Sequence, residues 1–173
     1  RPTKELASQV ASPPYDVVNR AEAREIAKGN PYSFLHINKP DIDLKDDIDS
    51  HDPLVYQAGR SNLDEFLSSG VLVKDEVESF YLYRQIMDEH EQLGLVAIAS
   101  VDAYDSGFIK IHEFTRPDKE KDRARHMVEL GAQVGPVFLT YKENPTLTNL
   151  MTEVSEGDPE YNFVDETRVR HTF

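Results

Sequence analysis

The chain has 173 residues, no cysteine, and 32 acidic against 19 basic side chains, which gives a formal net charge of −13. The absence of cysteine excludes a disulfide framework and thiolate-ligated metal sites, and the negative charge argues against nucleic acid as a partner. No apolar run approaches the roughly 20 residues of a membrane-spanning helix, so we expect a soluble, cytoplasmic protein with no membrane partner.

The N-terminal part is predicted to contain a short helix and a buried strand. Asn19 is a suitable N-cap for a helix over 20–28, because good helix formers follow it and Gly29 provides a stop. The compact apolar run 33–37 predicts a buried strand. His36 lies in this run, where a lone histidine is more often a satisfied core residue than a ligand or a switch.

A solvated loop and a second helix are predicted next. The loop over 41–52 carries six aspartates. It lacks the central glycine and terminal glutamate of a calcium-binding loop, so no metal site is predicted there. Asp52 as N-cap and Pro53 in the first turn begin a helix, whose apolar residues recur at helical spacing until Gly70.

The second half of the chain is predicted to alternate strands and helices. The expected elements are a hairpin over 79–101, a short strand over 108–111, a helix over 117–133, a strand over 136–141, a helix over 145–154 and two strands within 161–173. The strand–helix–strand order around the 117–133 helix permits a parallel pairing. These elements predict an α+β fold in which helices pack on a mixed β-sheet.

The length suits a single α+β domain over 1–173, with 142–173 as an alternative small subdomain. The chain begins at Arg1, and it stops within the alternating run 167–173, which is typical of an unfinished strand. We therefore expect the N-terminal fragment of a larger protein, whose C-terminal half is a further partner of this piece.

The predicted helix over 117–133 has one apolar face. Thr115 and Asp118 resemble a capping box, and Pro117 suits a first helical turn. At 3.6 residues per turn, the residues expected to share the apolar face are Ala124, Met127, Val128, Gly131 and Val134. Basic side chains line up beside that face.

The start of this helix is the predicted anion site, because a helix N-terminus offers unpaired N–H groups and the positive end of a dipole. The expected anion-binding residues are Thr115, Arg116, Lys119 and Arg123, and the expected acid–base residues are His112 and Glu113. The alternative is a surface helix whose basic residues pair with Asp118, Glu120 and Asp122 in solvent, each pair worth at most about 0.5 kcal/mol.

No common nucleotide or hydrolase signature is present: the sequence has no Walker A loop, glycine-rich dinucleotide turn, nucleophile elbow or H-E-x-x-H motif. Four segments nevertheless resemble, in order and spacing, the bacterial and archaeal family called domain of unknown function 1015. They are 13–17, 30–36, 112–115 with 122–123, and 135–138.

That family is similar to the ParB and sulfiredoxin superfamily, whose members bind nucleotides and include a free-serine kinase. The resemblance implies ATP or another nucleotide, with magnesium, and phosphoryl transfer to a small hydroxyl compound. It also implies a pocket, whose residues in this sequence are Tyr15, Asp16, Asn30, Ser33, His36 and Asp122. Members of the family continue to an Asp-Gly-His-His-Arg segment that resembles the phosphate-handling motif of the serine kinase.

Three functions fit these observations. The first is half of a nucleotide-dependent small-molecule phosphotransferase, with its anion site at the 112–126 helix start. The second is a non-catalytic regulator that uses a nucleotide to change partners. The third is an interaction scaffold, in which the basic stripe contacts an acidic partner surface or the C-terminal half.

Overall fold

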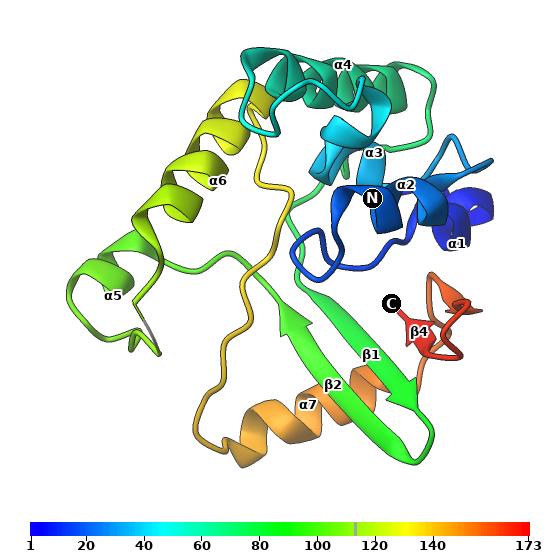
Figure 1. Ribbon diagram of the computed structural model, residues 1–173. Coiled ribbons are helices and arrows are strands. Elements are labelled where there is room, and N and C mark those ends of the chain that lie inside the picture. The colour runs from blue at the N-terminus through cyan, green and yellow to red at the C-terminus, as the bar shows by residue number, and fades with distance from the viewer. Residues whose placement is uncertain (113) are drawn as a thin grey trace. The chain divides into compact units, whose positions relative to one another are not determined.

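The computed structural model describes residues 1–112 and 114–173, and the chain divides into two compact units (Figure 1). The first unit comprises Arg1–Lys74 and Thr115–Phe138, and the second comprises Asp75–Phe114 and Leu139–Phe173. Within the two described ranges, no helix is long and apolar enough to cross a membrane.

The first unit is built from helices. Its elements are the 3-10 helix η1 (Lys4–Leu6), α1 (Ala7–Val10), α2 (Arg20–Ala27), α3 (Leu35–Asn38), the 3-10 helix η2 (Pro40–Asp43), α4 (Pro53–Ser68) and α6 (Pro117–Leu130). Helix α4 packs against α3, η2 and α6. Ile37, Leu63, Phe66 and Leu130 from these helices meet in the core, which places α6 beside α4 although about 50 residues of chain separate them.

The predicted helix starts in this unit are confirmed. Asn19 caps α2: its Oδ1 accepts from the N–H groups of Ala21 and Glu22, and Glu22 accepts in return from the Asn19 N–H. Asp52 caps α4 at the Leu54 N–H, with Pro53 in the first turn. Both caps are local interactions, which is why the sequence predicts them.

The strand predicted over 33–37 is wrong, because this run forms α3 (Leu35–Asn38). The N–H of Phe34 donates to the Val10 carbonyl, and the following N–H groups continue as turns of helix. A strand needs a neighbouring strand for its hydrogen bonds, and the described residues of the first unit contain none. A short apolar run fits a buried helix equally well.

The aspartate loop is held by two arginines of α2 and is not simply solvated. Arg20 donates to the carbonyls of Leu44, Lys45 and Ile48. Arg24 donates to the carbonyls of Ile42 and Leu44 and pairs with Asp46 at 2.6 Å. These bonds satisfy backbone acceptors that a loop without regular structure would otherwise leave to water.

The second unit contains the β-sheet, together with α5 (Val101–Asp105) and α7 (Pro145–Ser155). Its strands are β1 (Tyr81–Met87), β2 (His90–Val96), β3 (Asn162–Val164) and β4 (Arg170–Thr172). The strand order is β2-β1-β4-β3, and Figure 1 shows the long β1–β2 hairpin in green. The predicted hairpin, the predicted α7 and the predicted C-terminal strand pair are confirmed, and the chain has an α+β fold.

The mixed sheet is not observed, since every strand pairing among the described residues is antiparallel. The strands predicted over 108–111 and 136–141 do not form. The edge of β1 that does not face β2 pairs with β4, with Gln85 opposite His171. A local apolar run does not predict strand partners that are so distant in sequence. Helix α6 also ends earlier than predicted, at Leu130, because Gly131 adopts a left-handed φ of 63°.

Candidate functional site

At the start of α6, two of the predicted anion-binding residues, Thr115 and Arg116, contact carboxylates of the same helix. Arg116 is the N-cap and makes no capping hydrogen bond. Instead its guanidinium pairs with Asp118 at 2.8 Å, and the Thr115 hydroxyl donates to Glu120 at 3.0 Å. The predicted capping box is therefore absent. Two carboxylates already lie in the first turn, where they complement the positive end of the dipole, and Lys119 is exposed.

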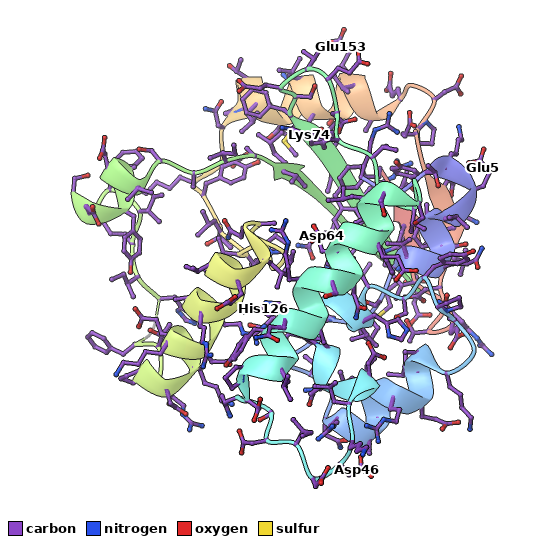
Figure 2. All side chains as sticks on the ribbon, turned by 90° about the horizontal axis from the view of Figure 1, so that it is seen from above. Glu5, Asp46, Asp64, Lys74, His126 and Glu153 are labelled. Carbon is purple, nitrogen blue, oxygen red and sulfur yellow. The ribbon has the colours of Figure 1, made fainter. Side chains whose placement is uncertain are left out.

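The buried face of α6 also differs from the prediction. His126 and Leu130 are the buried residues of the helix, and Val128 is 80% exposed. His126 lies between α6 and α4 (Figure 2), and its Nε2–H donates to the Ile37 carbonyl of α3 at 3.0 Å. Since residues four apart share a helix face, the face that carries 126 and 130 also carries Asp122. The polar contacts of His126 and Asp122 therefore orient α6 together with the apolar contact of Leu130 in the core.

Asp122 is the centre of a hydrogen-bonded chain between α4 and α6. The Tyr56 hydroxyl donates to its Oδ1 at 2.6 Å, and Nε and Nη2 of Arg123 donate to its Oδ2 at 3.0 and 2.7 Å. Burial by itself raises the pKa of Asp122, but the bonds from Tyr56 and Arg123 hold that pKa below its usual value. Burial and the adjacent carboxylate raise the pKa of Tyr56 to about 12. At neutral pH these three hydrogen-bonded groups are therefore a neutral phenol on Tyr56, a carboxylate on Asp122 and a guanidinium on Arg123.

Two arginines of α6 lie over tyrosine rings. The guanidinium of Arg123 is 4.4 Å from the ring centroid of Tyr15, and that of Arg125 is 4.4 Å from the ring centroid of Tyr56. Contacts of this kind are worth about 0.5–2 kcal/mol and restrict the cation to the ring face. Nη1 of Arg123 has no hydrogen-bond partner within the part of the chain that the structure describes. We call Tyr15, Tyr56, Asp122, Arg123 and Arg125 the arginine cluster.

The buried ring of His126 lies beside Tyr56 of this cluster and is neutral at neutral pH. It is 1% exposed, and its ring centroid is 6.3 Å from that of Tyr56. Burial, with a smaller effect from Arg123, lowers the pKa of His126 to about 4. The neutral ring keeps the Nε2–H that binds the Ile37 carbonyl, so His126 anchors α6 without adding charge to the cluster.

Three residues of the predicted pocket, Asn30, Ser33 and His36, lie together in a second cluster. Asn30 donates to the Gln9 carbonyl at 2.7 Å and accepts from the Tyr32 N–H. Ser33 is buried, and its hydroxyl is near the Leu35 N–H. These polar groups are engaged within the chain, which indicates that they hold the turn before α3.

His36 joins this turn to η2 and α4. Its Nδ1 contacts Asp43 Oδ1 at 2.8 Å and its Nε2 contacts the Asn30 carbonyl at 3.2 Å. Both partners can only accept, so both bonds form only when the imidazole carries two protons. The Asp43 bond, opposed by burial, raises the pKa of His36. Asn62 completes the cluster by donating to Asp43 Oδ2 and to the His36 carbonyl.

The structure thus brings together Tyr15, Asp122 and Arg123, and separately Asn30, Ser33 and His36. Asp16 and His112 are exposed, and His112 belongs to the second unit. Glu113 lies outside the described residues. Sequence reasoning missed Tyr56 and Arg125 in the first cluster, and Asp43 and Asn62 in the second. No local signal marks a tyrosine in α4 as the partner of a carboxylate 66 residues later.

The second unit contains a polar chain of its own. The Tyr83 hydroxyl and His171 Nδ1 are 2.6 Å apart, and His171 Nε2 is 3.0 Å from Asp165 Oδ2. Phe163 stacks on the His171 ring with centroids 5.2 Å apart. These hydrogen-bonded side chains join β1 to β4, two strands that pair through only three residue pairs. We therefore assign them a role in strand pairing.

Comparison with known proteins gives one match. The model of the family described as "Protein of unknown function (DUF1015)" matches residues 1–173. The chain belongs to this family. No curated protein and no solved structure matches it.

The His36 cluster predicts a pH dependence. The pKa of His36 is raised above 6.5 in the folded chain, so its stabilisation is complete below the unfolded value of about 6.5 and is lost as the pH rises through the folded pKa. We expect a loss of about 1 kcal/mol, roughly the worth of one charged hydrogen bond, as the pH rises above about 6.5. Urea unfolding at several pH values measures it.

The matched variants for this test are His36→Gln and His90→Gln, because His90 is exposed at the β1–β2 turn. His36→Gln should remove the loss above pH 6.5, and His90→Gln should retain it. His126 does not interfere, since its pKa of about 4 confines its effect to acid pH, where stability falls as pH decreases below 6.5. An unchanged pH profile in His36→Gln would contradict the assignment.

Proposed function

We propose that this chain is part of a nucleotide-binding small-molecule phosphotransferase, and that Arg123 binds a phosphate of the nucleotide. The fixed orientation of its guanidinium carries the proposal. Asp122 binds Nε and Nη2, the Tyr15 ring lies against one face, and the side chain is 28% exposed. Nη1 is left to donate to phosphate oxygens. A group ordered before the ligand arrives loses little entropy on binding.

The local charge supports an anionic ligand. Asp122 is satisfied by Tyr56 and Arg123, so its negative charge is offset within the cluster. Arg125 adds a second guanidinium. In a chain of net charge −13, a region with unpaired positive charge attracts anions from solution.

Transfer of the phosphoryl group would need further parts. We propose ATP or another nucleotide with magnesium, which offsets the charge of the reacting phosphates, and a small hydroxyl compound as acceptor. His112 and Glu113 stay the proposed acid–base residues. The resemblance to the ParB and sulfiredoxin superfamily supports a nucleotide ligand, and a C-terminal half of the same protein would complete the site.

The test is isothermal titration calorimetry of magnesium ATP with Arg123→Ala. Loss of a charge-assisted hydrogen bond should weaken binding about tenfold or more. Arg116→Ala is the matched control, because Arg116 lies on the same helix, is exposed, and pairs with Asp118. We expect Arg116→Ala to bind like the parent chain. If Arg116→Ala weakens binding and Arg123→Ala does not, the anion binds at the start of α6, which would contradict the role of Arg123.

A second candidate, a non-catalytic regulator or interaction scaffold, is favoured by the apolar surface of the second unit. Ile98 is 100% exposed, Phe114 98% and Phe108 80%. These residues follow β2, and the described residues between it and Thr115 form one short helix, α5, and no strand. Exposed apolar side chains in such number are typical of surfaces that bind another protein.

Turnover separates the two candidates. A phosphotransferase should form a phosphorylated product from magnesium ATP and a panel of small hydroxyl compounds, detected by mass spectrometry. A scaffold should form none, and light scattering should show self-association that Phe108→Ser reduces, with Lys110→Ser as the control on the same exposed stretch. Product formation by a chain that scatters as a monomer would contradict the scaffold.

A further inference from the structure

We propose that the arginine cluster recognises the phosphate chain of its ligand and not the base, so that it takes polyphosphates as a class. The inference rests on the proposed function and narrows it. The two tyrosines suggest stacking platforms for a nucleobase, because base–aromatic stacking is a common mode of recognition. Their surroundings contradict that role.

The ring of Tyr56 is closed to a base, and one face of the Tyr15 ring is covered. Tyr56 is 2% exposed, with the Arg125 guanidinium over its face and its hydroxyl bound to Asp122. Tyr15 carries the Arg123 guanidinium on one face. Gly135 lies beside the ring of Tyr15, since a β-carbon at Gly135 would be 3.7 Å from Cε1. A base could stack on the covered face of Tyr15 only by displacing the Arg123 guanidinium.

The hydrogen-bonding groups of the cluster lead to the same conclusion. The edges of adenine, cytosine and guanine present both donors and acceptors, so their recognition needs a protein acceptor. Asp122 is the carboxylate of the cluster, and each of its oxygens already accepts within the chain, Oδ1 from Tyr56 and Oδ2 from Arg123. The guanidiniums of Arg123 and Arg125 only donate, whereas the Tyr15 hydroxyl can donate or accept. The two guanidiniums match a phosphate, whose oxygens only accept.

The experiment compares tripolyphosphate, ATP, CTP, GTP and adenosine by calorimetry in magnesium-free buffer. We expect the four polyphosphates to bind with dissociation constants within about threefold of one another, and adenosine not to bind. Arg123→Ala should weaken all four about tenfold or more. Arg123→Lys keeps the charge but not the two-nitrogen contact with Asp122, and should recover only part of the affinity.

The outcomes separate this inference from the function on which it rests. If ATP binds at least about tenfold more tightly than the other polyphosphates and Arg123→Ala removes that binding, the proposed function stands and recognition of the phosphate alone is wrong. Binding of adenosine has the same meaning. If no polyphosphate binds, or if all bind Arg123→Ala as well as the parent chain, both are wrong.

Discussion

The carboxylate of Asp122 is the group on which the first unit depends. Its side chain is 12% exposed, and a carboxylate removed from water must be paired and hydrogen-bonded to remain ionised. Tyr56 and Arg123 supply those bonds from α4 and from α6 itself. Removing one partner would leave a poorly solvated charge, which costs more than the net stabilisation of the pair. The same bonds hold Arg123 in one orientation.

Other polar contacts keep α6 in this position. Arg60 of α4 donates to the Leu130 carbonyl at 2.9 Å, at the C-terminal end of α6. His126 donates to the Ile37 carbonyl of α3, and α3 also carries His36, whose contacts extend to η2 and α4. The arginine cluster is thus connected to the His36 cluster through one helix. Buried polar groups that are all satisfied specify a single packing arrangement more strongly than apolar contacts do.

Sequence reasoning succeeded where the decisive interactions are local. The caps at Asn19 and Asp52 depend on residues within a few positions of one another, and the β1–β2 hairpin pairs two strands that follow each other directly in the chain. It failed for 33–37, since the choice between strand and helix depends on a partner strand that the first unit does not provide. The family resemblance pointed to Tyr15, Asp122 and Arg123, which lie together in the structure. Tyr56 is separated from Asp122 by 66 residues, and no periodicity in the sequence indicates that contact.

We propose that Tyr56 and Asp122 position Arg123 for its ligand, and a double-mutant cycle on tripolyphosphate binding measures this coupling. Tyr56→Phe removes one hydroxyl at a site with no direct path to the ligand. It should weaken binding in the parent chain and have no effect in Arg123→Ala, a coupling of about 1 kcal/mol. Urea unfolding of each variant checks that the first unit remains folded. Equal effects of Tyr56→Phe in both backgrounds would contradict the claim.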